Sequence, residues 1–322
     1  MDQAKGLGIV LVVTAHVFIN SLDTVLQQLA RFIYLFHMPL FFILSGMLYK
    51  PEMTMVLIKK RSTSLLIPYM AFLLLLNIKP IVATIIHPSF QALPFFCGLI
   101  YGGFVLKGWF GVFWFISCLF ITQISYNTLL KYGGGGTYNP LSRQMVFIIL
   151  ICATLTLQKT PVRLPLAAEV VPIALVFFWT GHLASTQNLL KSKLMQILST
   201  LGTSSCLLIF CSGYATLIAF DMKSSLFGLP IVSLIFAISL VLIVLKVVIF
   251  ISKYRLIGKM MASLGSASLI IMYLSQPINI TLRSRDWPDF FILILSVALP
   301  YLIFHFINLH WMPRFVLLGI KK

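Results

Sequence analysis

Residues 6–20 read GLGIVLVVTAHVFIN, and residues 31–49 read RFIYLFHMPLFFILSGMLY. Each stretch is apolar but carries a histidine, His16 in the first and His37 in the second. A charged side chain inside a bilayer costs a few kcal/mol, so an ionisable residue there indicates function. Histidine also takes up and releases a proton near neutral pH. The two stretches predict chemistry within a membrane, with simple helix packing as the alternative.

The composition supports a membrane protein. The chain is 60% hydrophobic and 10% charged, and its mean hydropathy is +1.02. Since each span needs about 20 apolar residues, 322 residues have room for about ten spans. We therefore expect an all-α polytopic protein with one integral-membrane domain, residues 1–322. The expected spans are 6–22, 31–49, 63–86, 109–131, 144–158, 166–186, 194–220, 226–250, 260–281 and 289–311. We expect the first span to be retained, because no small-residue cleavage site follows it.

The net charge of +17 could indicate nucleic-acid binding, but the distribution of the cations argues against it. With the N-terminus inside, fifteen Lys and Arg residues fall on cytoplasmic segments and seven on the opposite side. This asymmetry follows the positive-inside rule and predicts that both termini are cytoplasmic. The fifteen are Lys5, Lys50, Lys59, Lys60, Arg61, Lys131, Arg143, Lys191, Lys193, Lys253, Arg255, Lys259, Arg314, Lys321 and Lys322.

Other common motifs give no second function. The five cysteines form no CxxC pair and no His/Cys cluster with zinc spacing, so no metal site is expected. The glycine run at 133–136 lacks the GK[ST] ending of a phosphate-binding loop and is typical of a linker. No internal repeat supports an inverted-repeat transporter.

Helix geometry predicts that the two histidines approach each other. With a rise of 1.5 Å per residue, His16 lies roughly 15 Å from the inner boundary and His37 about 9 Å from the outer one. Both would then lie in the outer half of the bilayer. Spacing along each helix also predicts polar faces that look into the bundle. These faces carry His16, Asn20 and Asp23 on the first span, His37, Phe41, Leu44 and Ser45 on the second, and Ser266, Tyr273 and Gln276 on the ninth; Glu169 opens the sixth span at its outer end.

The chain resembles the acyltransferase family 3 membrane proteins, and within them the branch often labelled fucose 4-O-acetylase-like. The most specific motifs are DQAKGLGIVLVVTAH at 2–16 and FHMPLFFILSG at 36–46. Weaker matches follow along the whole chain: KKR at 59–61 before LLIPY at 65–69, WFI at 114–116, LP at 164–165, Glu169, FFWTG at 177–181, DMKSS at 221–225, and GSASLIIMYLSQP at 265–277. Three positions depart from the family pattern. Lys5 replaces the usual Arg, Ser64 replaces a second Arg, and Gln276 stands where His is frequent, so a proton-transfer role at 276 is in doubt.

The resemblance implies a ten-helix enzyme of the bacterial inner membrane. Such enzymes move an acyl group, usually acetyl from acetyl-CoA, onto a carbohydrate such as an O-antigen, capsule, exopolysaccharide or lipid-linked sugar. A sugar hydroxyl is a poor nucleophile and needs a base within hydrogen-bonding distance. His16 is the expected general base, because burial favours its neutral form. His37 would orient the hydroxyl or protonate the leaving thiolate. An acyl-histidine intermediate remains open, as does the oxyanion donor, for which Ser45, Asn20 and Trp114 are candidates.

The donor and the acceptor call for different polar groups. Coenzyme A is cytosolic, so Lys5, Lys59, Lys60 and Arg61 are the expected phosphate contacts; the triplet at 59–61 is also explained as a topology anchor. The expected sugar contacts are Glu169, Tyr273, Gln276, Arg283 and Arg285. The alternative for Glu169 is that its side chain, near the membrane boundary, simply extends to water. The remaining histidines, His87, His182, His305 and His310, are expected to be structural.

Two other functions would also place polar groups in a membrane bundle. A lipid-linked sugar carrier or flippase would need neither a proton-transfer histidine nor a coenzyme A site. A polysaccharide polymerase would normally have a large extracytoplasmic loop, which we do not find in the sequence. Acyl transfer by the purified protein distinguishes the three possibilities.

Overall fold

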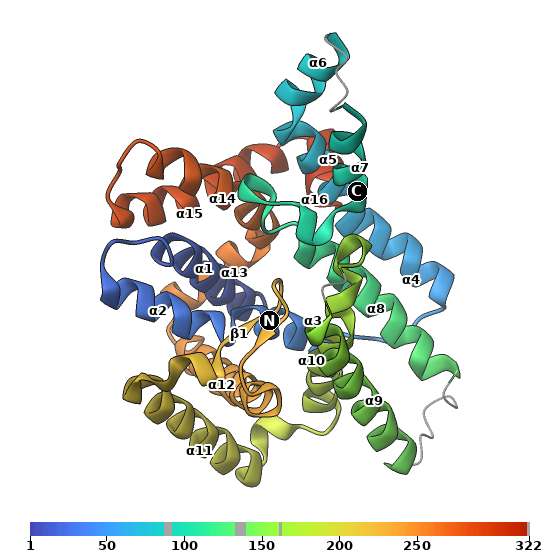
Figure 1. Ribbon diagram of the computed structural model, residues 1–322, viewed down its shortest axis with the longest axis vertical. Helices are drawn as coiled ribbons and strands as arrows, with labels where there is room; N and C mark the ends of the chain where they lie inside the picture. The colour runs from blue at the N-terminus through green and yellow to red at the C-terminus, as the bar shows by residue number, and fades with distance from the viewer. Residues whose placement is uncertain (87–91, 133–139, 161–162, 321–322) are drawn as a thin grey trace.

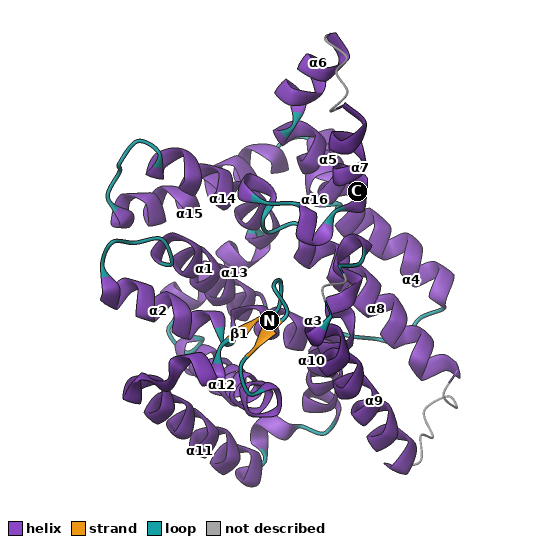
Figure 2. Ribbon diagram, in the orientation of Figure 1, coloured by secondary structure: helices purple, strands orange, loops and turns teal. Residues whose placement is uncertain are grey.

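The computed structural model describes residues 1–86, 92–132, 140–160 and 163–320. Within these ranges the chain is a helical bundle, and a short antiparallel hairpin interrupts the helices (Figure 1, Figure 2). Strands β1 (Phe220–Asp221) and β2 (Leu226–Phe227) pair Phe220 with Phe227 in this hairpin. The glycine run at 133–136 and His87 lie outside the described residues.

The helices follow the apolar segments of the sequence. The α-helices are α1 (Asp2–Phe18), α2 (Thr24–Tyr34), α3 (His37–Met47), α4 (Thr54–Arg61), α5 (Ile67–Leu76), α6 (Ile78–Ile86), α7 (Ala92–Tyr101), α8 (Trp114–Tyr132), α9 (Pro140–Lys159), α10 (Val171–Thr186), α11 (Lys193–Ile209), α12 (Pro230–Ile251), α13 (Arg255–Ser266), α14 (Ser268–Arg283), α15 (Asp289–Asn308) and α16 (Trp311–Leu318). Short 3-10 or π helices are η1 (Ser62–Leu66), η2 (Gly103–Val105), η3 (Gly108–Phe110), η4 (Pro165–Val170), η5 (Leu189–Lys191), η6 (Phe210–Tyr214) and η7 (Ala215–Ile218).

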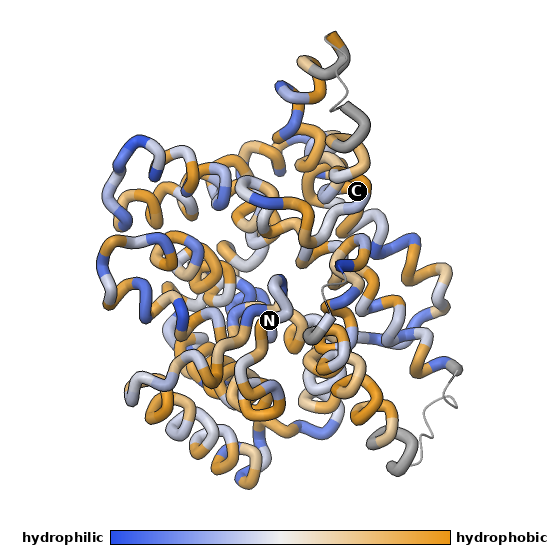
Figure 3. The backbone as a smooth tube through the Cα atoms, in the orientation of Figure 1, coloured by the Kyte–Doolittle hydropathy of each residue, from blue (hydrophilic) through white to orange (hydrophobic). Residues whose placement is uncertain are grey.

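Each expected span coincides with one or more of these helices. Six continuous stretches of the described chain are long and apolar enough to cross a membrane. They are Thr24–Met47, Gly108–Lys131, Pro165–Thr186, Lys193–Ile218, Pro230–Ile251 and Asp289–Asn308. The bent pair α13 and α14 raises the number to seven. The structure thus shows a multi-pass membrane protein, and the count of ten stays a prediction. Figure 3 shows hydrophobic residues along these helices and hydrophilic ones at connections such as that between α14 and α15.

Besides 31–49, which is divided between α2 and α3, two further expected spans are interrupted. The interval 260–281 is not one straight helix, because α13 and α14 meet at an angle of 75°. Ser266 Oγ donates to the Ser263 carbonyl oxygen at 2.7 Å just before the break, and such bonds bend helices. The interval 63–86 is divided between α5 and α6, where the Asn77 side chain donates to the Leu73 carbonyl oxygen at 2.8 Å.

Glycines bring the helices of the two histidines very close to their neighbours. A Cβ on Gly6 of α1 would lie 1.9 Å from the Met261 carbonyl oxygen of α13. A Cβ on Gly46 of α3 would lie 1.9 Å from the Phe178 carbonyl oxygen of α10. Small residues at helix crossings allow this approach in membrane proteins. The motif glycines therefore fix α1 against α13 and α3 against α10, which sets the position of both histidines.

Candidate active site

His16 lies two residues before the end of α1, at a point where another helix holds the α1 backbone. The Asn279 side chain of α14 donates to the His16 carbonyl oxygen at 3.0 Å. One turn further along α14, Arg283 donates to the carbonyl oxygens of Val17 at 2.7 Å and Asn20 at 2.9 Å. These donors satisfy carbonyls that have no partner within a helix end. They end α1 just after His16 and hold the imidazole at a fixed depth.

His37 begins α3 directly after a break in the second span. Its side chain is 3% exposed, and its Nδ1 lies 3.1 Å from the Ile33 carbonyl oxygen. Because a carbonyl oxygen only accepts, Nδ1 must carry the proton of this hydrogen bond. Nε2 of the neutral ring is then the unprotonated nitrogen.

Tyr34 links the two histidines into one cluster. The Tyr34 hydroxyl lies 3.1 Å from Nδ1 of His16, and its ring centroid is 4.7 Å from that of His37. The centroids of the two imidazoles are 6.2 Å apart, which confirms that the histidines approach each other. When His16 Nδ1 donates to the Tyr34 oxygen, Nε2 of His16 is free to accept a proton. A general base needs this tautomer.

A cavity of about 260 Å³ joins His16 to cationic side chains. Lys5 and Arg61 line it together with His16, and so do Ser45 and Trp114. Lys5 and His16 are eleven residues apart on α1, which corresponds to about 16 Å along the helix axis. The cavity therefore connects a cationic region near the start of α1 with an imidazole deep in the bundle.

The structure separates the basic triplet at 59–61. Lys59 is exposed, and Lys60 forms an ion pair of 2.5 Å with Glu52 while its side chain remains 55% exposed. Arg61 is partly buried and lines the cavity. Its Nε is buried without a hydrogen-bond partner among the described residues. Burial lowers the pKa of Arg61, and nearby Glu52 opposes this effect, but a guanidinium stays protonated at neutral pH. No ion pair of the described residues includes Arg61, so its guanidinium offers a positive charge to the cavity.

Six of the eight expected substrate contacts lie outside the cavity lining, and three of them, Asn20, Arg283 and Arg285, lie near the ends of α1 and α14. Asn20 is exposed in the turn after α1, since α1 ends earlier than the expected span, and Asp23 caps α2 by accepting from the Val25 and Leu26 amides. Arg283 holds the end of α1 and pairs with Asp289 at 2.6 Å. Arg285 is exposed in the turn after α14.

Tyr273 and Glu169 are buried, and Gln276 is half-buried. Tyr273 is fully buried and stacks on Phe72 with a centroid distance of 4.8 Å. Gln276 lies one turn further along α14, with a buried Oε1 that has no partner among the described residues. Glu169 is 4% exposed, so it does not reach water. Its Oε2 accepts from the Leu164 amide at 3.1 Å, which closes the loop before α10.

Sequence reasoning missed several residues of the site. Tyr34 precedes His37 by three positions, a spacing that places side chains on one helix face and would have indicated it. Gln123 lines the cavity from α8, and Asn279 follows Gln276 by three positions on α14. These signals were present in the sequence, although no motif singled them out.

The hairpin between α11 and α12 is a further part of the site. Asp221 of β1 lies near enough to interact electrostatically with His16 and Tyr34. Lys223 in the hairpin turn donates to the carbonyl oxygens of Leu106 and Gly111, both at 2.9 Å. Burial lowers the pKa of Lys223, and Asp221 opposes this effect. Lys223 therefore holds the hairpin against the residues 106–111, which brings Asp221 close to His16 and Tyr34.

Comparison with known proteins identifies the family of the chain. A family model described as an acyltransferase domain matches residues 1–320. No curated protein and no solved structure gives a match. Because the matched region covers nearly the whole chain, the protein belongs to the acyltransferase family 3 and is a membrane acyltransferase.

Proposed function

We propose that this member of the acyltransferase family is an O-acetyltransferase. It would move acetyl from cytosolic acetyl-CoA to a hydroxyl of a cell-surface or lipid-linked carbohydrate. The main support is the cavity that joins Lys5 and Arg61 to His16. Cationic side chains and a half-buried imidazole in one continuous space suit a donor with phosphates at one end and a thioester at the other.

The donor end of the cavity rests on Arg61 and Lys5. The Lys5 ammonium is 3.0 Å from the Asp2 carboxylate and stays partly exposed. Arg61 has no carboxylate partner among the ion pairs of the described residues. A guanidinium binds phosphate through two parallel hydrogen bonds, whereas an ammonium acts as a point charge. Arg61 would therefore make the stronger and more specific phosphate contact.

The reaction end of the cavity rests on His16. Its Nε2 would take the proton from the acceptor hydroxyl as the hydroxyl oxygen attacks the thioester carbonyl carbon. The carbon–sulfur bond then breaks, and the proton passes from Nε2 to the thiolate sulfur. The products are an acetyl ester and free coenzyme A. Tyr34 holds the imidazole through Nδ1, and His37 Nε2 would accept a hydrogen bond from the hydroxyl and so orient it.

We further propose ten spans in a bacterial inner membrane, with both termini in the cytoplasm. Helix α1 has 17 residues and the apolar part of α9 is Met145–Leu157, so both are slightly short for a bilayer core of about 30 Å. Including them, and the broken intervals 63–86 and 260–281, gives an even number of spans. That number agrees with the excess of Lys and Arg on the proposed cytoplasmic segments.

The test is mass analysis of surface glycans from strains with and without this gene, combined with acetyl transfer by the purified protein. We expect an acetyl increment on one sugar that depends on the gene, and consumption of acetyl-CoA in detergent solution. Movement of a lipid-linked sugar across vesicles without acetyl transfer would instead support the carrier alternative. Stable radiolabel on His16 after incubation with labelled acetyl-CoA would support the acyl-histidine route.

A further inference from the structure

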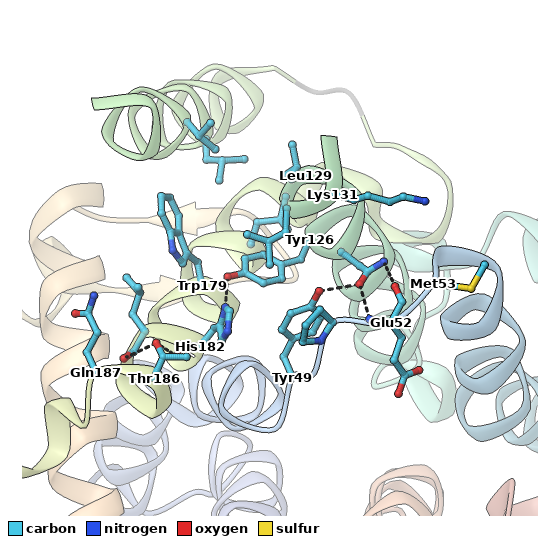
Figure 4. Close-up of a pocket in the computed structure, with 17 residues that line it drawn as sticks. Tyr49, Glu52, Met53, Tyr126, Leu129, Lys131, Trp179, His182, Thr186 and Gln187 are labelled. Carbon is cyan, nitrogen blue, oxygen red and sulfur yellow. Dashed lines mark hydrogen bonds between the residues drawn. The ribbon is translucent and has the colours of Figure 1, made fainter. Parts of the chain in front are cut away.

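A second and larger cavity lies away from His16. It measures about 720 Å³ and lies between α8, α9 and α10, where the connection 49–53 closes one side (Figure 4). This volume is within the range of about 300–1,000 Å³ that is typical of ligand sites. None of the residues proposed above for acetyl transfer lines it.

The lining of this cavity changes from polar to apolar along the helix axes. Thr186 and Lys131 lie at the ends of α10 and α8, whereas Leu175 lies eleven residues deeper in α10. The depth from Thr186 to Leu175 is about 16 Å, close to half of a bilayer core of about 30 Å. Trp179 and Leu150 add apolar surface in the deeper part. The cavity therefore has the depth and the polarity gradient of one membrane leaflet.

Several polar side chains in the wall already bind each other. Tyr49 donates to Oδ1 of Asn127 at 2.7 Å, and the hydroxyl of Tyr126 lies 2.6 Å from Nδ1 of His182. The Glu52 carboxylate is paired with Lys60. The ion pairs of the described residues do not include Lys131, which is exposed at the mouth. The mouth thus presents a cation above an apolar interior.

We propose that this cavity holds one acyl chain of an anionic phospholipid, with the lipid phosphate at Lys131. The lipid comes from the leaflet next to the ends of α8 and α10, which is the cytoplasmic leaflet in the proposed orientation. The chain fills the space between α9 and α10, and Lys131 selects an anionic headgroup over a zwitterionic one. This lipid site does not depend on acetyl transfer.

Native mass spectrometry of the full-length protein in detergent tests the site, with phosphatidylglycerol and phosphatidylcholine of identical chains as probes. We expect the first phosphatidylglycerol to bind more tightly than the first phosphatidylcholine. The substitution Leu150→Phe fills the cavity, and we expect it to lower the affinity for the first phosphatidylglycerol by about tenfold. Ile149→Phe is the matched control, because Ile149 is 61% exposed on another face of α9 and the affinity stays unchanged.

A second pair of variants tests the headgroup contact and preserves the cavity. We expect Lys131→Gln to lower the affinity for the first phosphatidylglycerol by about fivefold and to leave the affinity for phosphatidylcholine unchanged. Lys191→Gln is the control, since Lys191 is exposed and does not line the cavity. Melting temperatures in detergent confirm that each variant is folded; if Leu150→Phe is not, the lysine pair decides. The proposal would be overturned if the parent protein bound both lipids with equal affinity and if the folded cavity variants kept that affinity.

Discussion

Among the described residues, two histidine–tyrosine hydrogen bonds each line or adjoin a cavity. His16 Nδ1 lies 3.1 Å from the Tyr34 hydroxyl, and His182 Nδ1 lies 2.6 Å from the Tyr126 hydroxyl. The cavity of His16 also contains Lys5 and Arg61, and a second imidazole lies beside it. The cavity of His182 instead has a deep apolar wall, and its carboxylate, Glu52, is paired with Lys60.

The difference shows that a histidine–tyrosine hydrogen bond does not define a reaction centre by itself. What distinguishes His16 is that both Lys5 and Arg61 line its cavity and that a second imidazole, His37, lies 6.2 Å away between ring centroids. Helix α8 lines both cavities, and α3 contributes Ser45 to one while Tyr49, two residues after α3, lines the other.

The largest effect is expected from the two histidines themselves. His16→Ala should lower the rate of acetyl transfer by about 10²–10⁴-fold, because loss of a general base has that cost. His182→Ala should retain activity close to that of the parent protein, because His182 lies in the other cavity. Acetyl transfer from labelled acetyl-CoA by purified protein measures both, with expression and melting temperature as controls. If both variants lost the same amount of acetyl-transfer activity, His16 could not be distinguished from His182 as the general base.

The next effect concerns the close packing of α3 against α10. Gly46→Ala places a Cβ 1.9 Å from the Phe178 carbonyl oxygen, so α3 and α10 must move apart at a cost of about 1–3 kcal/mol. We expect a clear fall in melting temperature in detergent. Gly98→Ala is the control, since its Cβ would meet Val105 at an ordinary distance of 3.6 Å. A Gly46→Ala protein as stable as the control would contradict the close α3–α10 packing.

A smaller effect is expected for donor binding. Arg61→Ala should raise the apparent KM for acetyl-CoA by about tenfold or more, since a hydrogen bond to a charged group contributes about 1.5–3 kcal/mol. Lys59→Ala removes an exposed cation from the same triplet and should leave KM unchanged. Initial rates at varied acetyl-CoA concentration measure the difference. If both substitutions raise KM equally, general electrostatics rather than the cavity explains the triplet.

The smallest effect is expected from Tyr34. Tyr34→Phe keeps the ring and removes the hydroxyl that holds His16 Nδ1, a neutral hydrogen bond with a net contribution of about 1 kcal/mol. We expect kcat to fall by about fivefold at unchanged KM, with an altered pH profile of kcat. Tyr126→Phe provides the matching change in the other pair and should alter neither quantity. A pH profile of Tyr34→Phe identical to that of the parent protein would show that Tyr34 does not position the base.

The sequence predicted the helical class, the places of the helices and the approach of His16 to His37. These features follow from long apolar runs and a fixed rise per residue, which are local properties. The sequence also predicted that Lys5 and Arg61 lie at the same, cytoplasmic boundary of the membrane. In the structure both residues line the cavity of His16.

The missed features depend on contacts between distant segments. The expected face shared by His16 and Asn20 fails because Arg283, from a helix late in the chain, caps the end of α1. The ninth span bends near Ser266, whose hydroxyl donates to the Ser263 carbonyl oxygen. The sequence pattern alone predicted a straight helix there. Tyr34 belongs to the site through its hydroxyl contact with His16, a residue of another helix eighteen positions earlier. Hydropathy records none of these contacts.

Photolabelling tests the central claim most directly, because it shows which cavity receives the donor. An acyl-CoA analogue with a diazirine in its acyl chain would be irradiated with the protein, and the labelled peptides mapped by mass spectrometry. The account predicts labels on lining residues of the His16 cavity, such as Val12, Leu44 and Leu119, which excess acetyl-CoA suppresses. Labels that excess acetyl-CoA suppresses on Leu150, Leu175 or Trp179 of the other cavity, and not near His16, would contradict it.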